Sequence, residues 1–264
     1  MKTTTTGSAL DRLSDRVAGL DVARVEVVSF DLDGTLIDSR TAWRHGFAAP
    51  FAQLAARYPA LLALGDSAYV HDHVFQPFLT TIWERAGGEW SPNYVRDGWR
   101  MLLQHHAAPD GTTPDWAAAD AAHEEYEATW PAMMRLFEDS LTVLDAVQAR
   151  YPMILITNGN TAHQRMKIES HDLARWFRHV VVSEEVGLLK PDPAIFALAL
   201  APLGARAESA LHIGDMRAQD VAGARAAGWQ SAWVNRAGAP AVDEHQPDVE
   251  IAALEELLDL LELR

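Results

Sequence analysis

The amino-acid sequence predicts an α/β fold, a doubly wound parallel sheet with an all-helical domain inserted into it. Five short apolar runs are typical of buried parallel strands. They are Val25–Phe30, Met153–Ile156, Val180–Ser183, Leu211–Ile213 and Ser231–Val234. Helical patterns separate the later runs, and strands that alternate with helices favour a doubly wound sheet. Residues 40–135 lack this alternation, so we expect them to form a separate helical domain.

The domain boundaries follow from the same pattern. The chain has 264 residues, which is long enough for two domains. We expect an N-terminal tail over residues 1–22, a core domain over residues 23–39 plus 136–264, and the helical insertion over residues 40–135. An insertion that leaves from the end of the first strand would lie over the crevice where open α/β sheets bind ligands.

Helical periodicity predicts the elements between and after the strands. In the core we expect helices over Ala162–Ser170, Ala194–Leu200, Val221–Ala227 and, near the C-terminus, Val249–Leu263. In the insertion we expect helices around Ala42–Arg57, His73–Arg85, Tyr94–His105 and Trp116–Trp130, with prolines between them. The insertion also holds six of the nine tryptophans, most of which we expect in its core.

Composition narrows the classes of protein. The formal net charge is -15, and an acidic surface repels nucleic acids and anionic membranes, so we expect neither as a partner. The absence of cysteine excludes disulfides, thiolate nucleophiles and Cys-ligated metals. The polar start lacks the apolar segment of a secretory signal, and no apolar run approaches the length of a membrane span. We expect a cytoplasmic enzyme or binding protein, as a monomer or homodimer.

The first apolar run ends in two aspartates, Asp31 and Asp33, followed by Gly34 and Thr35. Side chains two residues apart on a strand point to the same face, so the two carboxylates would lie side by side. Like charges at a buried strand end are costly for a fold. A cation between them, or a division into one acid and one nucleophile, would give the pair a use. A surface turn is the alternative, because Asp-Gly favours turns.

The second strand end carries Thr157 and Asn158. Thr161 and Gln164 then fit a capping box, with Thr161 as the N-cap of the next helix and Gln164 at its third position. A hydroxyl, an amide and unpaired N–H groups near a helix start form a good anion site. A simple capped turn is the alternative.

The third and fourth strand ends add a lysine and further carboxylates. Lys190 precedes a proline, which favours an extended backbone, and Asp192 with Pro193 suits the start of a helix. At the fourth strand end, Gly214 is followed by Asp215, and Asp220 stands where the next helix begins. Clustered carboxylates suit Mg²⁺, and a lysine with N–H donors suits phosphate. Coincidence is a poor explanation for polar residues of this kind at all four strand ends. The alternative that they only form surface turns is therefore disfavoured.

These four strand ends together resemble the motifs of the haloacid dehalogenase-like hydrolase superfamily. The run Asp31-Leu32-Asp33-Gly34-Thr35-Leu36 is similar to its first motif, Thr157 to the second, Lys190 to the third, and Gly214-Asp215 with Asp220 to the fourth. The resemblance covers roughly residues 25–264, including the long insertion after the first motif. It implies a Rossmann-like core with a helical cap domain.

The resemblance also implies a role for each matching residue. Asp31 would be the nucleophile that forms an aspartyl-phosphate, and Asp33 the general acid/base. Thr157, Asn158 and Lys190 would bind the phosphoryl group. Asp31, the backbone carbonyl of Asp33, and Asp215 would hold Mg²⁺, supported by Asp220 directly or through water. Gly34, Thr35 and Gly214 would be supporting residues of the motifs.

Asp33 separates the branches of the superfamily. Members that act on 2-haloacids lack the second aspartate, because no phosphoester leaving group needs a proton, so Asp33 favours a phosphatase. The segment Ile156–Glu169 is similar to the branch with pyrimidine 5′-nucleotidases and acylneuraminate-9-phosphate phosphatases. We expect a small-molecule phosphoester substrate, a nucleoside monophosphate or a sugar phosphate. A phosphomutase of the same family, or a non-catalytic module that binds phosphorylated metabolites, stays open as an alternative.

Overall fold

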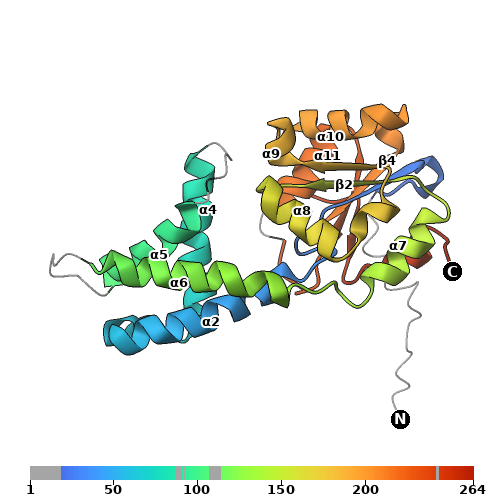
Figure 1. Cartoon of the computed structure of the whole chain (residues 1–264). Helices are drawn as coiled ribbons and strands as arrows, with labels where there is room; N and C mark the ends of the chain where they lie inside the picture. The colour runs from blue at the N-terminus through green and yellow to red at the C-terminus, as the bar shows by residue number, and fades with distance from the viewer. Residues whose placement is uncertain (1–18, 87–90, 92, 107–113, 242–243) are drawn as a thin grey trace, which may run out of the picture. The chain divides into compact units, whose positions relative to one another are not determined.

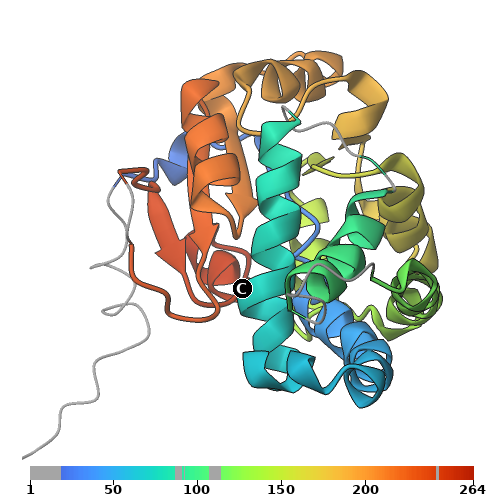
Figure 2. The same ribbon diagram turned by 90° about the vertical axis from the view of Figure 1, so that its left-hand side faces the viewer.

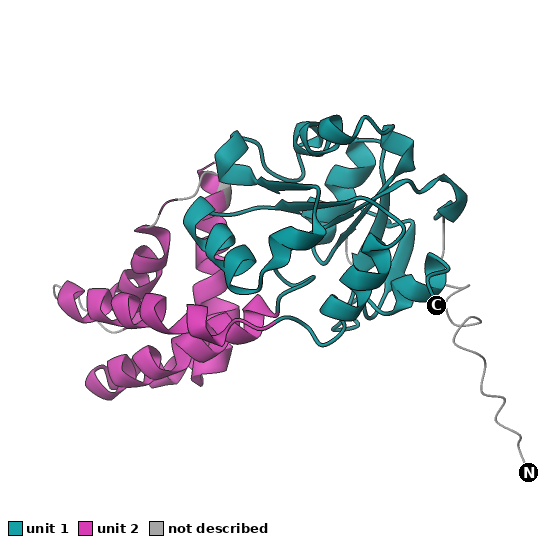
Figure 3. Cartoon of the chain, turned by 45° about the vertical axis from the view of Figure 1, so that its right-hand side comes forward, with its two compact units in different colours: residues 1–37, 136–264 teal, residues 38–135 magenta. Residues whose placement is uncertain are grey.

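The computed structural model describes residues 19–86, 91, 93–106, 114–241 and 244–264 (Figure 1). The chain divides into two compact units (Figure 3), unit 1 with residues 1–37 and 136–264 and unit 2 with residues 38–135. Of the tail expected over residues 1–22, residues 1–18 lie outside the described residues. Within unit 1 the chain leaves and returns at one place, where Ile37 bridges Leu136 and Phe137 N donates to Leu36 O (3.0 Å).

Unit 1 is built on a six-stranded sheet with the order β3-β2-β1-β4-β5-β6, in which every pair of neighbours is parallel. The strands are β1 (Val27–Phe30), β2 (Met153–Thr157), β3 (His179–Val182), β4 (Ala210–Gly214), β5 (Gln230–Val234) and β6 (Val249–Ile251). The five expected strands and the doubly wound parallel sheet are confirmed. The strand order reverses between β1 and β4, which is where such sheets bind ligands.

The expected helix over Val249–Leu263 is wrong in its first part. Residues Val249–Ile251 form β6, the edge strand beside β5 (Figure 2), and helix α12 covers only Glu256–Leu260. Val249 pairs with Ala232 and Ile251 with Val234, and both Val249 and Ile251 are fully buried. The open edge of β5 therefore offers these residues backbone hydrogen bonds and burial together, which outweigh a helical pattern in the sequence.

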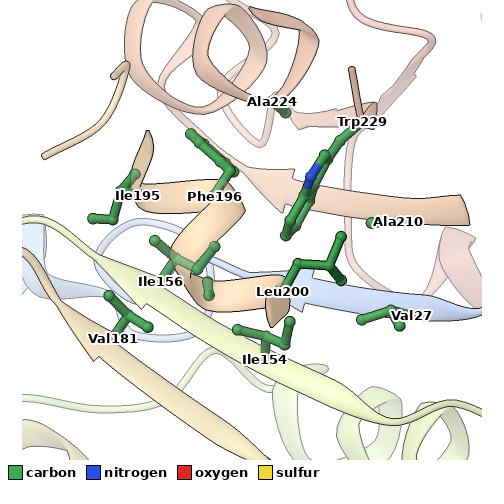
Figure 4. Close-up of a cluster of buried hydrophobic side chains, with 11 residues drawn as sticks. Val27, Ile154, Ile156, Val181, Ile195, Phe196, Leu200, Ala210, Ala224 and Trp229 are labelled. Carbon is green, nitrogen blue, oxygen red and sulfur yellow. The ribbon is translucent and has the colours of Figure 1, made fainter. Parts of the chain in front are cut away.

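Helices cover both faces of the sheet. Figure 1 shows α10 (Pro193–Leu200) and α11 (Ala222–Ala226) on one side, and α7 (Ser140–Gln148) and α8 (Thr161–Ser170) on the other. The short helix α9 (Ser183–Val186) follows β3. One face carries a core of Val27, Ile154, Ile156, Val181, Ile195, Phe196, Ala199, Leu200, Ala210, Ala224 and Trp229 (Figure 4). Burial of these apolar side chains holds α10 and α11 on the sheet, and so anchors the loops at its carboxyl edge.

Unit 2 contains helices and turns, and no strand among its described residues. Its helices are α2 (Ser39–Arg57), α3 (Ser67–Val70), α4 (Gln76–Arg85), α5 (Asn93–His106) and α6 (Trp116–Thr129), with a π-helical segment at His71–Phe75. Aromatic rings form its core: Trp99 stacks on Phe47 with centroids 4.6 Å apart and meets Phe75 at 5.2 Å and Tyr126 at 6.1 Å. None of the described helices in the chain is long and apolar enough to cross a membrane.

Candidate active site

Asp31 stands at the carboxyl end of β1, in the middle of the sheet. Its N–H donates to Ile213 O of β4 (2.8 Å), and its side chain is buried. The chain then turns sharply, with Gly34 at a φ of 81° and its N–H donating to Ile37 O (2.8 Å). A Cβ on residue 34 would lie 2.2 Å from Oδ2 of Asp215. Glycine is therefore required at this position both by the backbone and by the approach of the second carboxylate.

Lys190 joins two of the carboxylates. Its Nζ lies 2.6 Å from Oδ1 of Asp31 and 2.5 Å from Oδ1 of Asp220, and the side chain is 1% exposed. Burial opposes the charge on Lys190, but the carboxylates of Asp220 and Asp31 raise the pKa of Lys190 above its ordinary value. The lysine is thus a buried side chain whose positive charge is favoured by two carboxylates, in a protein that is acidic overall.

The Asn158 side chain holds the loop that carries Lys190. Asn158 Oδ1 accepts from Lys190 N (2.8 Å), and Asn158 Nδ2 donates to Lys190 O and to Gln219 Oε1 (both 2.9 Å). The peptide bond between Lys190 and Pro191 is cis. As predicted, Asp192 caps α10 by accepting from Ala194 N (2.8 Å). The end of β2 and the start of α10 together determine where the lysine lies.

Asp220 is a buried anchor behind the other carboxylates. Its oxygens accept from Lys190, from Met216 N (2.9 Å) and share a hydrogen bond with His212 Nε2 (3.1 Å). Burial raises the pKa of Asp220, but the Lys190 ammonium and the His212 contact outweigh it and hold the pKa below its usual range. A Cβ on Gly214 would lie 2.1 Å from Asp220 Cγ, so only glycine fits there.

Asp31, Asp215 and Asp220 form a group whose ligand oxygens lie within 4.8 Å of one another. Burial raises the pKa of Asp31 to about 7 although Lys190 opposes the rise. Burial and then the neighbouring Asp31 raise the pKa of Asp215 well above its usual range. Oδ1 of Asp215 is buried and has no hydrogen-bond partner among the described residues. A hard divalent cation would relieve this repulsion and satisfy that oxygen, so the donor set fits Mg²⁺.

Thr157 and Asp33 are linked through helix α8. Gln164 Nε2 donates to Thr157 Oγ1 and to Asp33 Oδ2 (2.9 Å), and Lys167 Nζ lies 2.8 Å from both oxygens of Asp33. Gln164 therefore does not serve a capping box. The N-cap of α8 is Asn160, whose Oδ1 accepts from His163 N (3.1 Å), so the prediction of Thr161 as the N-cap is wrong. Asn160 takes the cap because its backbone is extended, while Thr161 already lies in the helix.

The loop after β1 is braced from the C-terminal half of unit 1. Arg236 donates to both oxygens of Asp139 (2.9 and 3.0 Å) and to Thr35 O (3.2 Å), and Asp139 Oδ2 also accepts from Leu254 N (2.8 Å). Thr35 Oγ1 in turn lies 3.5 Å from Asp31 Oδ2. The supporting residue Thr35 is thereby fixed through its backbone as well as its hydroxyl.

The structure brings together the predicted residues of all four strand ends and adds others. We did not predict contacts of Gln164, Lys167 and His212 with the site. Gln164 and Lys167 are three residues apart on a helix that follows Thr157, which places them on one face. That spacing was a usable signal. His212 offered a weaker one, since it is a polar residue inside an apolar strand where it meets Ser29 Oγ at 3.0 Å.

The sequence matches the model of the haloacid dehalogenase-like hydrolases over residues 25–228. That match spans well over half of the chain, and Asp31, Thr157, Lys190 and Asp215 lie within it. The chain therefore belongs to the haloacid dehalogenase-like hydrolase family.

Similar curated proteins are phosphatases. The chain is 29% identical over 255 residues to phosphoserine phosphatase of Thermus thermophilus, with 88% of this chain and 98% of that protein covered. It is 27% identical over 250 residues to N-acylneuraminate-9-phosphatase of Rattus norvegicus, with 92% and 96% covered. The predicted resemblance to the phosphatase branch of the family is confirmed, and the chain is a phosphoric monoester hydrolase.

A solved structure with a similar fold is that of YfnB from Bacillus subtilis bound to magnesium. It superposes with a TM-score of 0.68 and 23% identity, and the match covers 90% of this chain and 99% of that one. The likeness shows a shared fold and confirms the α/β class with a Rossmann-like core.

Proposed function

We propose that this protein is a Mg²⁺-dependent phosphatase that hydrolyses a small phosphorylated metabolite through an aspartyl-phosphate on Asp31. The observation that carries the proposal is the group of Asp31, Asp215 and Asp220, in which Lys190 bridges Asp31 and Asp220, with Asp33 two residues beyond Asp31. A nucleophile, a cation site and a positive charge for phosphate are the parts that phosphoryl transfer needs.

The chain's own residues divide the work. An Asp31 oxygen forms a bond to phosphorus while the bond from phosphorus to the alcohol oxygen breaks, and Asp33 gives its proton to that oxygen. Asp33 then takes a proton from the water that attacks the aspartyl-phosphate, which frees phosphate and restores Asp31. Thr157, Asn158 and Lys190 hold the phosphoryl group, with Asn158 also placing Lys190.

The carboxylates of Asp31 and Asp215 and the backbone carbonyl of Asp33 would hold Mg²⁺, with Asp220 supporting them. When bound, the ion offsets repulsion between the carboxylates and the phosphate oxygens. Support for this assignment comes from the unsatisfied buried Oδ1 of Asp215 and from the raised pKa values of Asp31 and Asp215.

The substrate belongs to the class of sugar phosphates or nucleoside monophosphates, as we expected from the sequence. N-acylneuraminate-9-phosphatase is named for a sugar phosphate, which supports this class, whereas phosphoserine phosphatase is named for an amino-acid phosphate and supports only the wider class of small phosphorylated metabolites. That the helical residues 40–135 act as a cap that selects among them, and that the protein works in the cytoplasm, stay predictions.

Phosphate release from a panel of nucleotides, sugar phosphates and 4-nitrophenyl phosphate tests the proposal. We expect hydrolysis that requires Mg²⁺, stops on chelation and is lost in Asp31→Asn. Incubation with a second alcohol tests for a phosphomutase, which would return the phosphoryl group to organic product. Unchanged hydrolysis by Asp31→Asn would show that the mechanism is wrong.

A further inference from the structure

Two residues of helix α8 contact Asp33. Lys167 Nζ lies 2.8 Å from each oxygen of the Asp33 carboxylate, and Gln164 Nε2 donates to Asp33 Oδ2 at 2.9 Å. Lys167 also donates to Gln164 Oε1 at 2.8 Å. The three side chains therefore form a closed ring of contacts, in which neither Asp33 oxygen can rotate away without breaking an ion pair.

The two helix residues of this ring are buried, whereas the Asp33 side chain is partly exposed to solvent. Lys167 and Gln164 are each 2% exposed, whereas the Asp33 side chain is 20% exposed. Gln164 also donates to Thr157 Oγ1 from the same nitrogen that meets Asp33. A single amide thus sets the distance between Asp33 and the hydroxyl at the end of β2.

Burying a lysine is costly for a fold unless its charge is paired, and Lys167 is 2% exposed. Arg165 on the same helix already pairs with Glu185 of α9 (2.6 Å), near the surface. Lys167 instead forms an ion pair with Asp33, which is 134 positions away in the sequence at the start of the loop after β1. This placement favours a role at Asp33 over a role in holding the helix.

We propose that Lys167 and Gln164 are positioning residues that aim the Asp33 carboxyl for proton transfer to the leaving alcohol. The inference rests on the proposed function, in which Asp33 is the general acid/base. Proton transfer requires heavy atoms within about 2.6–3.2 Å of each other. A side chain displaced by about 1 Å can cost on the order of 10²-fold in rate. Because Asp33 lies on a loop, contacts from another element, here those from Gln164 and Lys167, are needed to fix the orientation of its carboxyl group.

The leaving group distinguishes this role from a structural one. Phenyl phosphate and 4-nitrophenyl phosphate have similar shapes, but phenolate leaves poorly without a proton and 4-nitrophenolate leaves readily. The ratio kcat/KM reports on the steps up to departure of the alcohol, which include the step in which Asp33 donates a proton to the leaving oxygen. For Lys167→Met and for Gln164→Leu we expect kcat/KM on phenyl phosphate to fall on the order of 10²-fold, with a clearly smaller loss on 4-nitrophenyl phosphate.

Three further variants complete the experiment. Arg165→Met removes a cation from the same helix outside the ring, so it should keep the wild-type ratio of the two substrates. Lys167→Arg should recover part of the loss, because it restores the charge. In an Asp33→Asn background, Lys167→Met should add no further loss with 4-nitrophenyl phosphate, because the group that it positions is already absent.

Two results would overturn the inference. One is an equal decrease in kcat/KM on the two substrates in both Lys167→Met and Gln164→Leu. The other is that Lys167→Met lowers kcat/KM in the Asp33→Asn background as much as it does in the wild type. These results are separate from a failure of the proposed function. That failure would appear as an Asp33→Asn protein with wild-type activity on phenyl phosphate. If Lys167→Met does not fold, as judged by circular dichroism, Gln164→Leu and Lys167→Arg still decide the outcome through the same substrate ratio.

Discussion

Nζ of Lys190 lies 2.6 Å from Oδ1 of Asp31, and both side chains are buried. The same nitrogen meets Asp220 at 2.5 Å, so one positive charge is shared between the proposed nucleophile and the anchor behind it. In a low-dielectric setting such a bridge is expensive to break from one side, because the remaining carboxylates lose their counter-charge.

We expect Lys190→Met to lower the free energy of unfolding of the metal-free protein by about 3–5 kcal/mol and to abolish phosphatase activity. Urea denaturation in the presence of a chelator measures the first effect. Arg225→Met is the matched control, since Arg225 is half exposed where it meets Asp248, and its loss should cost below about 1 kcal/mol. Equal costs for the two variants would show that the buried bridge does not stabilise the fold.

Gly34→Ala should impair both folding and metal binding. The new Cβ would lie 2.2 Å from Asp215 Oδ2, and the backbone φ of 81° is strained for any residue with a side chain. Gly204→Ala isolates the backbone effect, because Gly204 has a φ of 63° and nothing within 4 Å of its Cβ position. We expect about 1–3 kcal/mol of destabilisation at Gly204 and clearly more at Gly34, with loss of Mg²⁺-dependent activity only at Gly34. Thermal unfolding and an activity assay give both answers.

Mg²⁺ should stabilise the folded protein through Asp215. At a concentration of 100 Kd a bound ion adds about 2.7 kcal/mol to the free energy of unfolding. Asp215→Asn should lose most of this gain. It should also be more stable than the wild type without metal, because it removes a carboxyl group whose ionisation is opposed by burial and by Asp31. Asp172→Asn, at an exposed position, serves as the control. An undiminished Mg²⁺ effect in Asp215→Asn would contradict the assignment of this ligand.

Unit 2 should lose stability in mild acid because of His71. This side chain is buried against Phe47, and burial lowers the pKa of His71 despite its contact with Asp72. The unfolded chain, in which a histidine titrates near about 6.5, then binds a proton more readily than the folded one. The neutral His71 side chain therefore costs the fold nothing in protonation above about pH 6.5. The free energy of unfolding then decreases as the pH falls from about 6.5 toward the lower pKa of His71 in the folded protein.

His71→Gln should therefore flatten the decline in unfolding free energy between about pH 7 and pH 5, relative to the wild type. Removal of the exposed His45 from the same unit, as His45→Gln, is the matched control. Denaturation at several pH values, followed by tryptophan fluorescence, provides the comparison. A decline that persists unchanged in His71→Gln would assign the acid sensitivity to other groups.

Much of the site could be predicted because a parallel sheet imposes a simple rule on the chain. Each apolar run that became a strand ends at the same edge, so Asp31, Thr157 and Asp215 could be expected to meet from their order alone. Lys190 follows β3 only after helix α9, and the side chain of Asn158 holds it at that edge. Local chemistry was equally readable at Asp192, which caps α10 as expected. Proximity of this kind depends on strand direction and not on the particular packing of side chains.

Other features depended on contacts between distant parts of the chain. The apolar residues of the C-terminal segment 249–263 have helical spacing. Its first three residues, Val249–Ile251, nevertheless form a strand because the edge of β5 is available for pairing. Thr161 and Gln164 have the spacing of a capping box, yet Asn160 took the cap and Gln164 turned to Asp33, 131 residues away. In each case a local preference worth about 1 kcal/mol competed with burial and long-range hydrogen bonds.

By itself, then, the sequence determined the class of fold, the order of the motifs and the chemical character of each strand end, since these follow from periodicity and residue type. Only the tertiary structure decided that Lys190 is shared between Asp31 and Asp220, and that Lys167 and Gln164 hold Asp33. The physical reason is that local spacing can place two side chains on one face of a helix, whereas the partner of a buried charge is decided by the packing of whole elements.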